Sequence, residues 1–306
     1  MKFSKFLLIA SFALLVALNA AANPVELRIP KPRSDLDTSY GYYTELLHKA
    51  LNKAANGRPV PVLLPTLAME QDRAVQELAR GRTIDIFWMG ADQKRNTALR
   101  AIPIPLERGL MGYRQFIVHR LRVTEFDQVR NLADLQKFSA CQGTHWPDTE
   151  ILREADLKVK TSTGYESLFR QVAAGRCDYF PRGFHEIRIE MNKRAAEFPG
   201  LVAYEPLILH YPFAVYFYVR QDNQRLAEWI QQGLEKMIDD GELLAHMQEH
   251  QHTRRAFPLI TASPRRLIEI PNNRLPDAGS FNTARYWFQA SDFTAVEPLP
   301  GRDTLK

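Results

Sequence analysis

The order of hydrophobic and polar residues repeats once along this chain. Gln76–Phe87 reads QELARGRTIDIF and Gln171–Phe180 reads QVAAGRCDYF. In each segment a helical stretch ends at a Gly-Arg pair, and a short apolar run with an Asp at its entry follows. Gly81 and Gly175 stand where a helix C-cap favours a left-handed backbone. The apolar runs have the length of buried parallel strands. The two segments therefore predict two α/β lobes built alike.

Other stretches fit the same scheme. Residues 41–53 place apolar side chains at helical spacing, and residues 213–219 (FAVYFYV) are rich in β-branched and aromatic residues. They predict a helix and a strand. Thr163, three residues before Glu166, predicts a capping box for a helix over 167–174.

The fold class predicted from this order is α/β, with two lobes that each hold a mostly parallel sheet flanked by helices. The chain is expected to cross between the lobes near 117–121 and near 204–210, which forms a hinge suited to closing on a small molecule. The expected division is 23–118 for lobe 1, 119–206 for lobe 2, 207–255 for the return part of lobe 1, and 256–306 for an extended C-terminal tail on lobe 1.

Residues 1–22 have the features of a secretory signal peptide. Lys2 and Lys5 give a basic start, residues 6–18 are apolar except for Ser11, and Ala20–Ala22 offer a small-residue cleavage site. The apolar run is short for a permanent anchor, although an uncleaved anchor is the alternative. We expect the leader to be cleaved and the protein to be located in the periplasm.

The charge of the chain is mildly basic. The formal net charge is +5, and loss of Lys2 and Lys5 leaves +3 (5 − 2). Charges of both signs are mixed, and Arg254-Arg255 is too short a basic cluster to follow a phosphate backbone. We therefore expect no nucleic-acid partner.

The sequence contains two cysteines, Cys141 and Cys177. An oxidising compartment favours a disulfide between them. However, Cys141 is expected near the C-terminal end of its strand and Cys177 at the start of another. If these strands are parallel neighbours, the two thiols lie at opposite ends, beyond the separation that a disulfide tolerates. We therefore expect two buried free thiols.

Five short motifs in one order resemble a known family. They are GYYTELL at 41–47, GRTID at 81–85, NLADL at 131–135, GRCD at 175–178 and DDG at 239–241. Over about residues 25–251 the chain resembles the bacterial extracellular solute-binding proteins of family 3, the periplasmic components of amino-acid-type ABC importers. The resemblance implies a type II periplasmic-binding-protein fold, a small-molecule ligand, an ABC permease as membrane partner and no cofactor.

The resemblance also implies a ligand anchor. In this family an arginine at the place of Arg95 holds the ligand carboxylate, which a guanidinium fork matches with two hydrogen bonds. The chain departs from the family's α-amino-acid pattern, because Gly183, preceded by Arg182, stands where those members carry an Asp. If Arg95 and Arg182 both face the cleft, the ligand should carry negative charge at two points, or an acid plus a sugar-like or aromatic part. The expected ligand is therefore a small, carboxylate-bearing molecule.

Further candidates surround these two arginines. Residues 143–146 follow the first strand of the second lobe, where backbone N–H groups at a helix start can hold an anion. Aromatic side chains can stack on a ligand ring or cover an apolar stem, and core packing is their alternative role. The expected ligand-binding residues are Tyr40, Trp88, Arg95, Gly143, Thr144, His145, Trp146 and Arg182. Glu186 is a further carboxylate on a neighbouring turn.

Enzymatic functions have weaker support in the sequence. His246, Glu249 and His250 match the zinc-peptidase pattern H-x-x-E-H, but the match has three fixed positions and falls on the expected last helix. We expect no catalytic residue and no metal. Two alternatives stay open: a periplasmic dehydratase with Glu186 or His145 as base, and a ligand sensor for a membrane receptor. The protein is expected to be a monomer.

Overall fold

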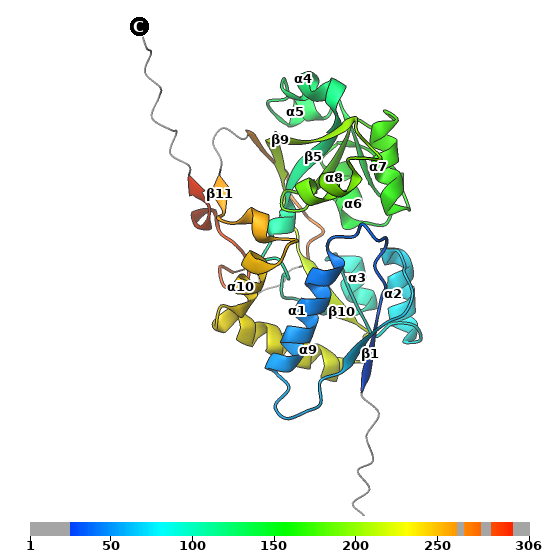
Figure 1. Ribbon diagram of the computed structural model, residues 1–306, viewed down its shortest axis with the longest axis vertical. Helices are drawn as coiled ribbons and strands as arrows, with labels where there is room; N and C mark the ends of the chain where they lie inside the picture. Colours follow the sequence, from blue (N-terminus) through cyan, green and yellow to red (C-terminus); the bar gives the residue numbers. More distant parts are fainter. Residues whose placement is uncertain (1–24, 262–265, 277–282, 296–306) are drawn as a thin grey trace, which may run out of the picture.

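The computed structural model describes residues 25–261, 266–276 and 283–295, so the expected signal peptide lies outside the described residues. The elements form two lobes, one on each side of the middle of the molecule (Figure 1). None of the helices in the described ranges combines the length and apolar character that a membrane crossing needs.

Lobe 1 contains two small sheets and the helices around them. Strands β1 and β2 pair in parallel, and β10 pairs antiparallel with both β3 and β4. Its first part comprises β1 (Glu26–Ile29), α1 (Tyr40–Lys53), β2 (Val62–Pro65), α2 (Gln71–Arg80), β3 (Ile86–Gly90), α3 (Gln93–Ala98) and β4 (Arg100–Ile102). Its return part comprises β10 (Val215–Val219), α9 (Gln224–Asp239) and α10 (Glu242–Glu249).

Lobe 2 is built on a sheet in the order β12-β9-β5-β8-β6-β7. The pairs β6·β7 and β6·β8 are parallel, whereas β5 runs antiparallel to β8 and β9. The elements of this lobe are α4 (Val123–Phe126), α5 (Leu132–Leu135), β6 (Ser139–Gly143), α6 (Pro147–Glu154), β7 (Lys158–Ser162), α7 (Tyr165–Ala173), β8 (Tyr179–Gly183) and α8 (Ile187–Arg194). Strands β5 (Tyr113–His119) and β9 (Leu201–His210) carry the chain into the lobe and out of it.

The sequence repeat has the same structure in both lobes. Gly81 and Gly175 adopt φ angles of 64° and 65°, so the predicted left-handed turns are confirmed. The Asp that follows each turn ties neighbouring strands together. Asp85 accepts hydrogen bonds from the backbone N–H and the guanidinium of Arg28, and Asp178 accepts them from the backbone N–H of Ser139 and from Arg122. The repeated Asp is therefore a structural residue in each lobe.

The core of lobe 1 forms where α1 packs on α9. The apolar face of α1, which includes Leu46, Leu47 and Ala50, is fully buried. Gly233 of α9 allows the two backbones to approach closely, because a Cβ at that position would lie 1.9 Å from the carbonyl oxygen of Ala50. This packing holds α1, whose first turn faces the other lobe, in a fixed position.

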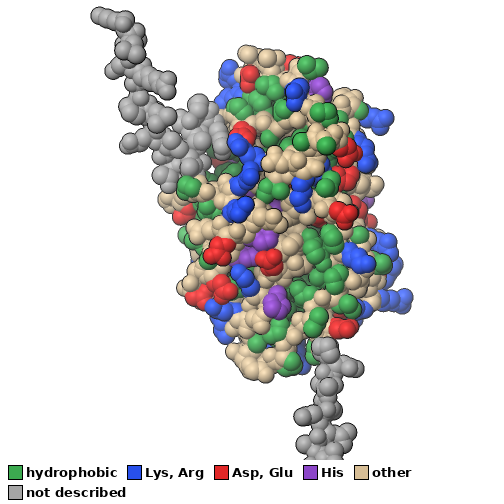
Figure 2. All heavy atoms as spheres, in the orientation of Figure 1, with side chains coloured by type: hydrophobic (Ala, Val, Ile, Leu, Met, Phe, Trp, Pro, Cys, Tyr) green, Lys and Arg blue, Asp and Glu red, His purple; other side chains and the backbone are tan. Residues whose placement is uncertain are grey.

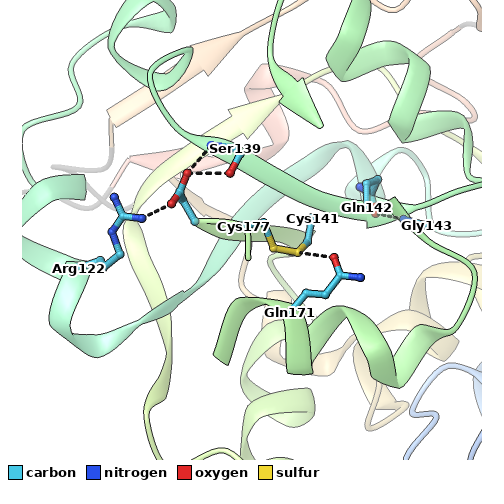
Figure 3. Close-up of a disulfide and its surroundings, with 8 residues drawn as sticks. Arg122, Ser139, Cys141, Gln142, Gly143, Gln171 and Cys177 are labelled. Carbon is cyan, nitrogen blue, oxygen red and sulfur yellow. Dashed lines mark hydrogen bonds and ion pairs between the residues drawn. A yellow bond between two sulfur atoms is a disulfide. The ribbon is translucent and has the colours of Figure 1, made fainter. Parts of the chain in front are cut away.

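The two cysteines form a disulfide, which corrects the expectation of free thiols (Figure 3). Strand β8 begins at Tyr179, which pairs with Ala140, the second residue of the short strand β6. Cys177 lies in the bend before β8 and not in the paired part of the strand, and this bend brings its Cα atom to 5.6 Å from that of Cys141. The strands are parallel neighbours as expected, but the thiols do not lie at opposite ends.

The tail lies on both lobes, whereas the sequence placed it on lobe 1 alone. Strand β12 (Arg266–Glu269) pairs in parallel with β9 and extends the lobe 2 sheet. Farther along, Arg285 forms ion pairs with Glu235 and Asp239 of α9 in lobe 1. Strands β11 (Ile260–Thr261) and β13 (Thr294–Ala295) pair with each other. The tail therefore bridges the two lobes on the hinge side.

Candidate functional site

A cavity of about 90 Å³ lies between the lobes, and we call it the cleft cavity. Lobe 1 lines it with the loop over 30–39, the start of α1 and the end of β3. Lobe 2 lines it with the start of α6, the end of β8 and the turn after β8. Side chains of both lobes therefore line one small volume, as expected for a site that forms when two lobes close.

Aromatic side chains form the lobe 1 wall of the cleft cavity. The ring of Trp88 lies 5.8 Å from that of Tyr40 and 5.5 Å from that of Tyr43, measured between centroids. Trp146 of lobe 2 also lines the cavity. This wall presents flat apolar surface with a few polar edges, which suits a ligand with a ring or an apolar stem.

Arg33 and Asp37 provide the charged groups of the loop over 30–39. Nε of Arg33 donates to Oδ2 of Asp37 over 3.0 Å, and Asp37 also accepts from the backbone N–H and hydroxyl of Ser39. Burial alone would raise the pKa of Asp37, but the nearby Arg33 charge and these hydrogen bonds outweigh burial and hold the pKa well below its usual range. Asp37 is therefore ionised and fixes the Arg33 side chain.

The guanidinium of Arg33 keeps two donor groups free. Within the described part of the chain, Nη1 and Nη2 of Arg33 have no hydrogen-bond partner, since only Nε donates. The Arg33 side chain lines the cleft cavity and is 20% exposed. An arginine that is held at one edge and open at the other can bind a carboxylate through both terminal nitrogens.

The arginines of lobe 2 that line the cleft cavity are already paired. Arg114 donates to Oδ1 of Asp148 over 2.6 Å. Arg182 donates from Nε and Nη2 to the carboxylate of Glu190 and lies 3.0 Å from Oε2 of Glu186. These buried pairs shape and polarise the floor of the cavity, and their carboxylates reduce the positive charge there.

Each carboxylate that lines the cavity pairs with a lining arginine: Asp37 with Arg33, Asp148 with Arg114 and Glu186 with Arg182. Arg182 also pairs with Glu190, which does not line the cavity and offsets the charge of Lys31, the remaining lining cation. The charges around the cavity are therefore close to balanced.

Arg95 lies in a neighbouring cavity of about 330 Å³, which we call the Arg95 cavity. Its guanidinium donates to the carbonyl oxygen of Gly90 over 2.5 Å and to that of His145, in lobe 2, over 2.6 Å. Burial lowers the pKa of Arg95, and the nearby Asp92 partly offsets this effect. Arg95 is therefore buried and joins the two lobes, and its role as a ligand anchor stays a prediction.

The expected site residues lie around two neighbouring cavities, and Trp146 forms a wall between them. Tyr40, Trp88 and Arg182 line the cleft cavity, whereas Arg95, Thr144 and His145 line the Arg95 cavity. Trp146 lines both cavities. Gly143 supports this wall, because a Cβ there would lie 2.4 Å from the Trp146 indole.

Sequence reasoning did not identify Arg33, Asp37, Arg114 or Asp148 as site residues. The first two lie in a loop whose length and Pro-Arg-Ser-Asp composition indicated only an irregular segment. A signal was available in the i, i+4 spacing of Arg33 and Asp37 next to the buried Ser39, which is typical of an ion pair that fixes a loop. Arg114 and Asp148 gave no local signal, since their contact depends on how β5 meets α6.

Comparison with solved structures identifies the architecture. An ancestral arginine-binding protein bound to arginine is 18% identical, with 74% of this chain and 97% of that chain covered and a TM-score of 0.52. An arginine-specific periplasmic binding protein from Salmonella typhimurium is 14% identical, with 74% and 99% covered and a TM-score of 0.54. The chain has the type II periplasmic-binding-protein fold. No protein-family model and no curated protein matches the sequence.

A third solved structure with this binding-protein fold is an ancestral amino-acid-binding protein described as a precursor of cyclohexadienyl dehydratase. It is 17% identical, covers 74% of this chain and 94% of its own, and has a TM-score of 0.53. At these identities the comparisons show the fold alone. The prediction of a type II fold from the five short motifs is confirmed.

The H-x-x-E-H motif lies on α10 of this binding-protein fold, away from the cleft cavity. Nε2 of His246 lies 3.2 Å from the carbonyl oxygen of Tyr42, and Nδ1 of His250 accepts from the backbone N–H of His252. Both imidazoles thus make contacts within lobe 1 that position α10 and the chain after it. The motif is accounted for by packing between α1 and α10.

Proposed function

We propose that this protein is a periplasmic solute-binding protein that captures a small carboxylate-bearing molecule in the cleft cavity. The observation that carries the proposal is Arg33, which lines a cavity between the lobes and whose two terminal nitrogens have no hydrogen-bond partner among the described residues. Capture, not chemical conversion, is the function that this arrangement supports best.

The chemistry of the cavity supports a carboxylate with an apolar or aromatic part. Nη1 and Nη2 of Arg33 match the two oxygens of a carboxylate, while Tyr40, Tyr43 and Trp88 offer rings for the rest of the ligand. Lys31 is a lining cation with no carboxylate partner in the described ranges, and the ligand carboxylate can supply one. Every carboxylate that lines the cavity already pairs with an arginine, so a ligand ammonium group would find no free partner.

Closure of the lobes would provide the binding energy by removing water from the ligand. Contacts between the lobes lie around the cavity: the Ser34 hydroxyl donates to Glu166 over 2.8 Å, and Arg95 donates to the carbonyl oxygen of His145. A ligand that touches both lobes shifts the population toward this closed form. A membrane partner that recognises the closed form then distinguishes loaded from empty protein.

The expected partner is the permease of an ABC-type importer, which the sequence resemblance implies. Solved neighbours include an ABC transporter substrate-binding protein of Streptococcus pneumoniae bound to arginine. A membrane signalling receptor would recognise the same closed form, so the binding site would be the same for either partner. Export to the periplasm rests on the leader over residues 1–22, and we propose a monomer that acts there.

A thermal-shift screen tests the proposal. The protein from residue 23 onward would be screened with monocarboxylates, dicarboxylates, amino acids, amines and sugars, because a ligand that binds only the folded state raises the melting temperature. Carboxylates with an apolar part should raise it and amines should not. A response only to amines or cationic amino acids would contradict the carboxylate, and no response to any class would contradict capture. Mass spectrometry of each hit after incubation separates capture from dehydration.

A further inference from the structure

Three side chains that are far apart in the sequence meet beneath the cleft cavity. They are Glu107, in the segment between β4 and β5, His185, in the turn after β8, and His252, just after α10. All three are buried, and the atoms they offer as metal ligands lie within 4.8 Å of one another. Glu107 and His252 belong to lobe 1, whereas His185 belongs to lobe 2.

The distances within this cluster match a metal site better than a hydrogen-bonded network. Nε2 of His185 lies 3.5 Å from Oε2 of Glu107, and Nε2 of His252 lies 3.5 Å from Oε1 of Glu107. Neither approach is a hydrogen bond of ordinary length. The two approaches end on different oxygens of Glu107, so the carboxylate faces both imidazoles, and the single ligand atoms that the three residues offer lie within 4.8 Å of one another.

The buried polar atoms of the cluster also lack partners. In the described ranges, Oε2 of Glu107, both ring nitrogens of His185 and Nε2 of His252 have none. Buried polar atoms in folded proteins are almost always satisfied, because leaving one unpaired costs about 1–3 kcal/mol. A cation between the three side chains would satisfy one atom of each.

Neighbouring side chains also contact Glu107 and His252. The Tyr43 hydroxyl donates to Oε1 of Glu107 over 2.6 Å, and Oγ1 of Thr38 lies 3.4 Å from Nδ1 of His252. Such outer contacts orient metal ligands and set the ring nitrogen that faces the ion. Oε1 of Glu186 lies 3.8 Å from Nε2 of His252, so a further carboxylate faces the cluster, although Glu186 itself pairs with Arg182.

We propose that Glu107, His185 and His252 bind a divalent first-row transition metal of the zinc class. Two imidazoles with a carboxylate are typical ligands for such ions. Because the ligands come from both lobes, the metal fastens lobe 2 to lobe 1 below the cleft cavity. This inference does not depend on the identity of the captured solute.

The test uses Zn²⁺ and the protein from residue 23 onward. After removal of metal with a chelator, Zn²⁺ is titrated in competition with a chromophoric chelator, and bound zinc is counted by mass spectrometry. One equivalent should bind, and H185A and H252A should each weaken binding at least tenfold. H48A, which changes an exposed histidine, and H246A, which changes the H-x-x-E-H motif, are matched controls and should bind zinc as the wild type does.

A second measurement covers the case in which a variant does not fold. X-ray absorption and anomalous scattering on the zinc-loaded wild type should place the ion at bonding distance from Glu107, His185 and His252, with nitrogen and oxygen ligands. Absence of stoichiometric zinc in the wild type would overturn the proposal. So would an ion located at His246 and His250, or binding that survives in folded H185A and H252A.

Discussion

The guanidinium of Arg33, from a loop of lobe 1, lies 4.6 Å from the centre of the Tyr165 ring in lobe 2. The next residue, Ser34, donates a hydrogen bond to Glu166, the next residue after Tyr165. Two adjacent residues of one lobe therefore contact two adjacent residues of the other. The loop over 30–39 lines one side of the cleft cavity, and Arg33 is one of its lining residues.

The first prediction separates Arg33 from Arg95 as ligand anchor. R33K keeps the charge but loses the planar fork, so the affinity for the best carboxylate of the thermal-shift screen should fall at least tenfold, measured by calorimetry. R58K is the matched control, because Arg58 also lies over an aromatic ring, that of Trp229, far from the cleft. If R95K abolishes binding while R33K leaves it unchanged, Arg95 is the anchor that the sequence resemblance implied.

The second prediction concerns acid stability and Asp37. The pKa of Asp37 is lower in the folded than in the unfolded protein, so the unfolded state takes up its proton first. The stabilisation is therefore complete above about pH 4, near the unfolded pKa, and is lost as the pH falls through the folded pKa. D37N should reduce the free energy of unfolding by about 1–3 kcal/mol at pH 7, the range for hydrogen bonds to charged groups.

Denaturant unfolding between pH 7 and pH 3 measures this effect. The difference in unfolding free energy between wild type and D37N should shrink below about pH 4, because the Asp37 carboxylate of the unfolded wild type is then protonated while that of the folded protein is still ionised. D35N, at an exposed position of the same loop, should follow the wild type throughout. A difference that stays constant with pH would show that Asp37 stabilises the loop by packing and not by charge.

Features encoded within a few residues could be predicted from the sequence. Gly81 and Gly175 mark turns because a left-handed backbone is a local requirement that glycine meets most easily. The two strands that cross between the lobes, β5 and β9, lie before and after the second copy of the repeat. The predicted capping box failed, since Gly164 is the N-cap of α7 and makes no side-chain cap bond. Glu166 instead pairs with Arg194 and Ser34. A distant arginine competes for that carboxylate, and local sequence does not reveal it.

Features that depend on how strands meet could not be predicted. The disulfide was missed because the cysteine spacing does not fix how the bend before β8 lies against β6. The ion pair of Arg114 with Asp148 likewise depends on how two distant elements, β5 and α6, meet. The resemblance to a family predicted two lobes, but the side chains that face the cleft cavity come from loops whose conformations the sequence does not reveal.

The third prediction tests the disulfide. The bond closes a loop of 36 residues, and chain-entropy arguments give a stabilisation of about 4 kcal/mol for a loop of that size. The C141A/C177A double variant should lower the free energy of unfolding by up to that amount, measured in guanidinium chloride. Wild-type protein treated with a reductant should unfold like the double variant. If wild-type protein unfolded without a reductant contained free thiols, the disulfide would be contradicted and the expectation of two free cysteines would be correct.

The last prediction compares the same substitution in two helices that pack on each other. In G233A the new Cβ would lie 1.9 Å from the carbonyl oxygen of Ala50, a backbone atom that cannot rotate away, so α1 and α9 must separate. In G41A the nearest atom lies 3.6 Å away, an ordinary contact, and alanine favours the helix. Thermal unfolding should show a loss of about 1–3 kcal/mol for G233A, as for other overpacked cores. G41A should unfold at or slightly above the wild-type temperature. Because α1 begins at Tyr40 on the cleft wall, G233A should also weaken solute binding. Equal stability of the two variants would contradict the prediction, since α1 and α9 would then be farther apart than described.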